Sequence, residues 1–100
     1  MMASRSEHAL QLRISLLEVI APASRCASCG AAHDVEDLEI DHPNGRTWAC
    51  RALNFLDRIR RQWRELDAGV ALRALCRRCN AIDGNRRFRG RPRYRRPRYA

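Results

Sequence analysis

Lysine is absent from this chain of 100 residues: all twenty basic residues are arginine, and they outnumber the eleven acids to give a net charge of +9. Aromatic residues are scarce at 6%, so the chain can build only a small core although 45% of its residues are hydrophobic. A chain of this length forms one domain. It buries roughly 60–65% of its unfolded surface, so an additional staple would help it to stay folded.

Long apolar runs are also missing. No segment approaches the roughly 18–20 residues that a membrane span needs. The N-terminus lacks the charged region and the following apolar block of a signal peptide. We therefore expect neither a secreted nor a membrane-bound protein.

Acids are missing from residues 86–100, which hold eight arginines and carry +8 of the net +9. Like charges repel and bury little apolar area, so we expect this tail to be disordered by itself. Guanidinium groups bind phosphates, and the interleaved Phe88, Tyr94 and Tyr99 can stack on bases. Both properties favour nucleic acid as the partner. A solubilising tail, or one that binds an acidic protein or a membrane surface, is the alternative. The tail arginines expected to bind nucleic acid are Arg86, Arg87, Arg89, Arg91, Arg93, Arg95, Arg96 and Arg98.

Hydropathy patterns predict an α+β chain without internal repeats. The expected helices cover residues 6–20, 50–67 and 77–86, and the expected strands cover 38–42 and 72–75. The helix at 50–67 has the clearest signal, because its apolar residues recur three and four positions apart. The first strand is expected to end at its C-terminal side in a turn, since proline cannot donate to a ladder and Asn-Gly favours a turn.

Four of the five cysteines form two Cys-x-x-Cys pairs, Cys26/Cys29 and Cys76/Cys79. Each pair can present two thiolates to one tetrahedral ion, so the two pairs predict a structural zinc site. Zinc binding in small peptides contributes about 10–16 kcal/mol, comparable to the stability of a whole small domain. A redox dithiol is the alternative, but it needs no second pair. We expect the fifth cysteine, Cys50, to be a buried apolar residue rather than a ligand.

A second group with chemical potential is Asp41-His42 at the end of the first strand, together with Asn80 after the last cysteine. Carboxylate and amide oxygens suit Mg²⁺ or Mn²⁺, and a neutral imidazole can take a proton from water near pH 7. Neighbouring residues of a regular strand point to opposite faces, so both line one site only if the strand ends there. Pro43 provides that break. A surface Asp-His pair at a strand end is the alternative.

These motifs together resemble the zinc-bearing HNH endonucleases of the His-Me finger (ββα-metal) superfamily. The shared pattern is Cys-x-x-Cys, a strand ending in Asp-His, and then Leu-Cys-x-x-Cys-Asn. The string Arg-Ala-Leu-Cys-x-x-Cys-Asn is also similar to recombination endonuclease VII, a phage junction-resolving enzyme of that superfamily. The match runs in order over about residues 12–85.

The resemblance implies a zinc-stapled β-hairpin packed on a helix, forming a DNA endonuclease or nickase domain over residues 1–85. His42 is then the general base, and Asp41 and Asn80 hold one catalytic Mg²⁺ or Mn²⁺. The four paired cysteines hold the structural zinc, and the products carry 5′-phosphate and 3′-hydroxyl ends. In addition to this pattern, the chain has an N-terminal helix, an inserted helix at about 50–67 and the basic tail.

The chain departs from the pattern in two places. The usual Asn about five residues before the third cysteine, which pins the loop of the catalytic His, is Ala71 here. Asn54 could replace it, or could be an ordinary solvated helical residue. The 33 residues between His42 and Cys76 also exceed what a compact version needs. We interpret the helix at 50–67 as an insertion whose arginines could contact DNA. Near the site, the arginines that could clamp phosphates are Arg46, Arg77 and Arg78.

A non-catalytic zinc module that binds nucleic acid is the alternative function, and a small adaptor with an acidic protein partner is a third. Sequence specificity could come from a homodimer or from a protein partner, because a chain this short has little room for a second recognition domain. The expected location is the cytoplasm of a bacterial or phage-infected cell, on the nucleoid when DNA is bound.

Overall fold

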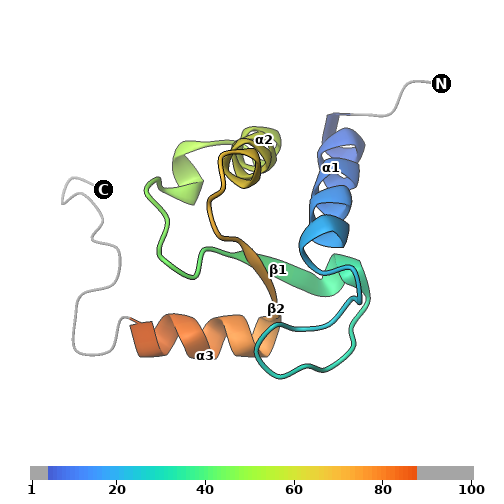
Figure 1. Ribbon diagram of the computed structural model, residues 1–100. Helices are drawn as coiled ribbons and strands as arrows, with labels where there is room; N and C mark the ends of the chain where they lie inside the picture. The colour runs from blue at the N-terminus through green and yellow to red at the C-terminus, as the bar shows by residue number, and fades with distance from the viewer. Residues whose placement is uncertain (1–4, 88–100) are drawn as a thin grey trace.

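The computed structural model describes residues 5–87, which form an α+β fold (Figure 1). This part of the chain contains three α-helices and one two-stranded sheet, so the predicted α+β class is confirmed. In chain order the elements are α1 (Arg5–Ile20), the 3-10 turn η1 (Val35–Asp37), β1 (Leu38–Asp41), the 3-10 turn η2 (Cys50–Ala52), α2 (Phe55–Asp67), β2 (Arg73–Cys76) and α3 (Arg77–Arg87). Of the helices described, none combines the length and the apolar character needed to cross a membrane.

The sheet consists of β1 and β2, which pair antiparallel with Leu38 opposite Cys76 and Asp41 opposite Arg73. The connection between the strands contains η2 and α2, and α3 follows β2 without a loop. The helix predicted as an insertion therefore does lie between the two strands. Two antiparallel strands followed directly by a helix is also the order of elements that the sequence pattern predicts.

The helices cover the sheet on two sides. In Figure 1, α1 and α2 lie above the two strands and α3 lies below them. A long-range hydrogen bond joins the first two helices, because the indole Nε1 of Trp63 donates to the carbonyl oxygen of Leu12 at 3.1 Å. α3 packs against both strands, whereas α2 packs mainly against α1 and reaches the end of β1 through Glu65.

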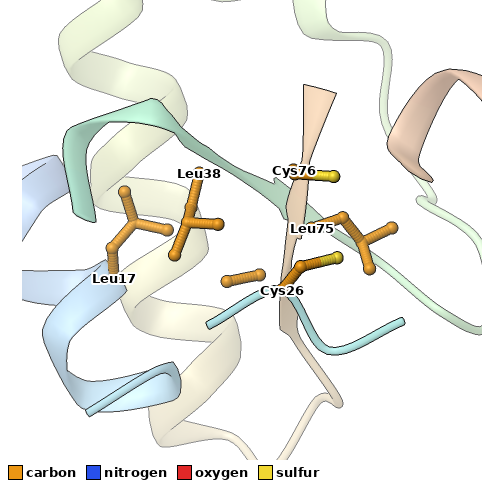
Figure 2. Packing of buried hydrophobic residues seen from close by; sticks show 6 residues of the cluster. Leu17, Cys26, Leu38, Leu75 and Cys76 are labelled. Atoms are coloured by element: carbon orange, nitrogen blue, oxygen red, sulfur yellow. The ribbon is translucent and has the colours of Figure 1, made fainter. Parts of the chain in front are cut away.

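The core is small and consists of aliphatic and sulfur-containing residues (Figure 2). Leu17 from α1, Leu38 from β1 and Leu75 from β2 are completely buried. Cys26 and Cys76 belong to the same buried cluster, with exposed fractions of 2% and 6%. Two of the four cysteines predicted to bind metal are therefore also part of the hydrophobic core.

The second helix begins later than predicted. The sequence pattern predicts a continuous helix over 50–67, but the structure has a short 3-10 turn at its start and then α2 from Phe55. The reason is a cap: the Asn54 side chain accepts a hydrogen bond from the Asp57 backbone N–H at 2.8 Å, which satisfies a free donor of the first turn. Cys50 therefore lies in η2, before the helix. The other bounds differ by one residue, since β2 includes Cys76 and α3 extends to Arg87.

Candidate functional site

The four paired cysteines come together in one cluster. Their sulfur atoms all lie within 4.8 Å of one another, which is compatible with a structural zinc site. Among the residues described, this is the one group of three or more cysteine, histidine and acidic side chains close enough to hold a metal ion. Cys50 is outside the cluster and is only half-buried, with its sulfur 2.8 Å from the Arg46 guanidinium.

The first cysteine pair is shaped by a tight turn. The N–H of Ser28 points to the sulfur of Cys26 at 3.4 Å, and the N–H of Gly30 donates to the Cys26 carbonyl oxygen at 2.9 Å. Gly30 has a φ of +75°, a conformation that glycine adopts without strain. The N–H of Ala27 also donates to the carbonyl oxygen of Ala74 in β2 at 2.9 Å. This last bond fixes the turn against the strand that carries the second pair.

The sulfurs influence one another's protonation. Burial raises the pKa of Cys26, but backbone N–H donors and the Cys79 side chain outweigh burial and lower the pKa from 9.0 to about 6. A hydrogen bond with the Cys76 sulfur, together with burial, raises the pKa of Cys79 from 9.0 to about 12. Backbone N–H donors, with the Cys79 thiol, thus favour the thiolate form of Cys26, while Cys79 keeps its proton. A metal ion could take the place of that proton, because zinc binds thiolates.

Asp41, the last residue of β1, is buried with an exposed fraction of 8%. The Nε of Arg73, directly opposite on β2, donates to the Asp41 Oδ2 at 2.8 Å. A second nitrogen of the same guanidinium donates to the Asp83 Oδ2 on α3 at 3.0 Å. The hydrogen bond with Asp41 raises the pKa of Arg73, with the charges of both carboxylates adding to the effect. One cation thus lies between two carboxylates from different elements.

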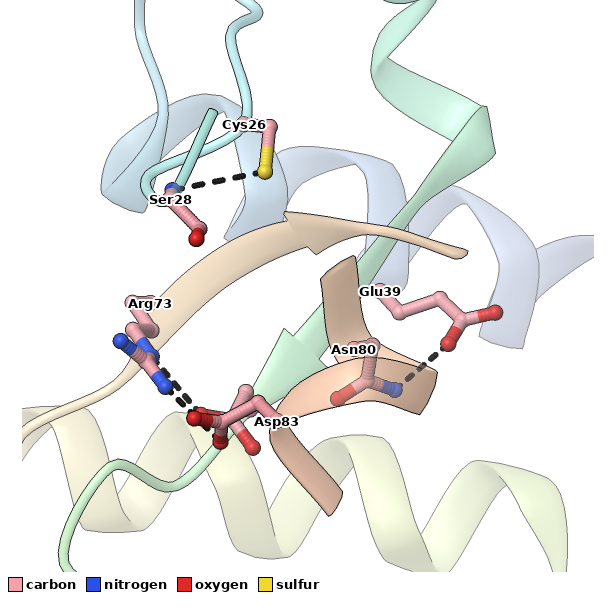
Figure 3. Close-up of polar contacts among 7 residues, drawn as sticks. Cys26, Ser28, Glu39, Arg73, Asn80 and Asp83 are labelled. Atoms are coloured by element: carbon pink, nitrogen blue, oxygen red, sulfur yellow. Dashed lines mark hydrogen bonds and ion pairs between the residues drawn. The ribbon is translucent and has the colours of Figure 1, made fainter. Parts of the chain in front are cut away.

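Asn80 lies on α3, one turn before Asp83. Its side-chain amide nitrogen donates to the Oε1 of Glu39 on β1 at 2.6 Å. A carboxylate only accepts hydrogen bonds, so this contact fixes which end of the amide faces Glu39. The amide oxygen then points away from Glu39, toward the side of Figure 3 on which Asp83 and Arg73 lie. The Asn80 amide oxygen therefore faces the same side as the two carboxylates.

His42, the residue after β1, is more deeply buried, with an exposed fraction of 4%. Its Nε2 lies 2.9 Å from the Oε1 of Glu65 on α2. The indole nitrogen of Trp48 donates to the same oxygen at 3.2 Å, and the two rings meet edge to face at 5.8 Å. Asp41 and His42 are thus neighbours in sequence, but the contacts described hold Asp41 toward β2 and α3 and His42 toward α2.

Arginines lie on two sides of these groups. Arg77 and Arg78 are exposed at the start of α3 and line a cavity of about 450 Å³ together with Glu39. On the other side, the guanidinium carbons of Arg46 and Arg61 lie 5.3 and 5.4 Å from the centre of the Trp48 ring. Arg86 and Arg87 belong to α3 but their side chains are not described, and the remaining tail arginines from Arg89 to Arg98 lie outside the described residues.

Asn54 is engaged locally, because its side-chain oxygen caps α2. The residues that contact the predicted site were absent from the sequence prediction: Glu39, Trp48, Glu65, Arg73 and Asp83. A signal existed for Arg73 only, since opposite charges pair across strands once the register is known. For Glu65 the sequence contains no signal, because its contact with His42 joins residues 23 positions apart across a loop.

Comparison with known proteins gives no further assignment. No family model matches the chain, and neither a curated protein nor a solved structure matches it.

Proposed function

We propose that the chain is a zinc-stabilised, metal-dependent DNA endonuclease or nickase of the HNH type. The proposal combines the sequence resemblance with the order of the elements, two antiparallel strands followed by a helix. In it, Cys26, Cys29, Cys76 and Cys79 bind structural zinc. The closeness of the four sulfurs supports this part.

The observation that carries the catalytic part is the convergence of oxygen ligands from β1 and α3. Arg73 bridges the carboxylates of Asp41 and Asp83, and Asn80 turns its amide oxygen toward the same side. Carboxylate and amide oxygens are the ligands that hard divalent cations prefer, so the donor set fits Mg²⁺ or Mn²⁺ in kind. A divalent cation bound here would displace the Arg73 guanidinium, which balances both carboxylates in this structure.

The proposed mechanism assigns one task to each group. His42 takes the proton from the attacking water as general base. A divalent cation held by Asp41 and Asn80 would stabilise negative charge on the phosphate and on the leaving 3′ oxygen. Exposed Arg77 and Arg78 bind the flanking phosphates, because guanidinium groups form paired hydrogen bonds with phosphate oxygens.

A plasmid nicking assay tests the proposal. Zinc-loaded protein is incubated with supercoiled DNA and Mg²⁺ or Mn²⁺, with EDTA as the metal-free control. We expect nicking with either metal and a loss of about 10²- to 10⁴-fold in His42→Ala, the range for a general base. His8→Ala is the matched control, because His8 is exposed on α1. Equal activity in the wild type and His42→Ala would point to a contaminant, and intact DNA with folded wild-type protein would refute the proposal.

A non-catalytic zinc module that binds nucleic acid is the second candidate. One observation favours it: His42 and Asp41 are 4% and 8% exposed, and both already have charged protein partners. This candidate predicts DNA binding that weakens steeply with salt. It also predicts that binding is the same in His42→Ala and is independent of divalent metal, which a filter-binding titration would measure.

A further inference from the structure

The carboxylate of Glu65 is the direct partner of the buried His42. Glu65 comes from α2, the helix inserted between the two strands, and only 14% of its side chain is exposed. One oxygen of this carboxylate, Oε1, accepts a hydrogen bond from Trp48 at 3.2 Å and lies 2.9 Å from the His42 Nε2. The contact therefore lies inside the protein, where solvent competes little for either group.

The hydrogen bonds that the Glu65 Oε1 accepts determine the tautomer of His42. An indole N–H can only donate, so the Glu65 Oε1 acts as an acceptor toward Trp48. A carboxylate oxygen that accepts from both neighbours requires a proton on the His42 Nε2. In the neutral imidazole the remaining nitrogen, Nδ1, then carries the free lone pair. The contact selects one of the two neutral tautomers and fixes the direction in which the ring can accept a proton.

We propose that Glu65 is a positioning residue that holds His42 in the tautomer with Nδ1 as the base. This inference rests on the proposed nuclease function and assigns to the inserted helix a part in the site. The HNH sequence pattern places a pinning Asn at the position of Ala71, which is exposed here. Asn54, the other candidate for that task, caps α2. Glu65 is the described residue whose side chain hydrogen-bonds to the imidazole in their place.

The charged surroundings are consistent with this assignment. Arg46 and Arg61 lie near the Trp48 ring, so two positive charges lie beside the indole that donates to the Glu65 Oε1. On the other side of the strand end, the charge of Asp41 is balanced by Arg73. Glu65 is thus the acidic group that directly contacts His42 among the interactions described.

The test uses Glu65→Gln, which keeps the shape of the side chain but can present either an acceptor or a donor to His42. Nitrogen-15 NMR of the two imidazole nitrogens reports the tautomer, and the nicking assay on the same zinc-loaded samples reports the rate. We expect one neutral tautomer, protonated at Nε2, in the wild type and a mixture in the variant. We expect the nicking rate to fall about 10- to 100-fold, the range for residues that orient a metal-bound histidine. Glu65→Asp should recover part of both signals.

Glu18→Gln is the matched control, because Glu18 is exposed on α1. If Glu65→Gln cleaves DNA at the wild-type rate, the positioning role of Glu65 is overturned while the nuclease function stands. An unchanged single tautomer in the variant would overturn it as well. If the folded wild-type protein leaves DNA intact, the nuclease function fails first and the positioning role fails with it.

Discussion

Removing the metal from the four-cysteine cluster should unfold the domain. The perturbation is EDTA with a reductant added to the zinc-loaded protein. Two of the four cysteines, Cys26 and Cys76, are also among the six residues of the buried core cluster. Loss of the ion would therefore leave partly charged sulfurs inside the core. It would also disconnect the two Cys-x-x-Cys pairs.

The magnitude follows from the size of the core. Its largest fully buried apolar side chains are the four leucines Leu16, Leu17, Leu38 and Leu75. Each contributes roughly 1.5–3 kcal/mol, so together they contribute about 6–12 kcal/mol. Structural zinc contributes about 10–16 kcal/mol in small peptides. Zinc binding and the burial of these four leucines thus contribute similar free energies. Each is as large as the net stability of a whole domain, which is only about 5–15 kcal/mol.

Far-UV circular dichroism and a colorimetric zinc-release assay follow the experiment. We expect the helical signal and the cooperative thermal transition to disappear as zinc is released, and to return when zinc is added back. Cys76→Ser should behave like the EDTA-treated protein. Cys50→Ser is the matched control, because its sulfur lies outside the cluster. A metal-free protein that keeps the transition at the same Tm would refute the reasoning.

Three further predictions concern α2, the bridging arginine and the tail. Asn54→Ala removes the cap of α2 and should lower the free energy of unfolding by about 1 kcal/mol in a urea titration, whereas an unchanged midpoint would contradict the cap. Arg73→Ala leaves the buried Asp41 without its cation and should cost about 1–3 kcal/mol. Mn²⁺ should then raise the Tm of this variant more than that of the wild type, and an equal shift would argue against cation binding between Asp41 and Asp83. Deletion of residues 88–100 removes six arginines and should weaken DNA binding and reduce the slope of log K against log salt by up to about 5, while unchanged affinity would show that the tail is not a DNA-binding segment.

The sequence predicts those features that depend on local spacing. The two Cys-x-x-Cys pairs and the first strand, predicted over 38–42 and observed over Leu38–Asp41, were identified to within one residue, because each is encoded in a few consecutive residues. The start of α2 was predicted wrongly although a local signal existed. Asn54 followed three residues later by Asp57 is a pattern typical of a helix N-terminus. The apolar stripe that continues to Leu53 concealed it.

The partners of the candidate catalytic residues could not be predicted in the same way. Arg73 pairs with Asp41 over 32 positions and Glu65 contacts His42 over 23 positions. Periodicity indicates which face of an element is buried, but it does not determine which residue of a distant element lies opposite. These contacts depend on how the connection between the strands folds back, which is a property of the packed domain. The catalytic roles of Asp41, His42 and Asn80 stay predictions.

The pairing of Cys76 with Leu38 has a consequence for the alignment of the whole hairpin. Cys76 is both the last ladder partner in β2 and a member of the sulfur cluster. A slip of one residue would turn every side chain of β2 to the opposite face. It would separate Arg73 from Asp41 and move Cys76 away from the other sulfurs. In the proposed zinc-bound form, metal coordination would therefore favour the native register of two strands that have only four residues each.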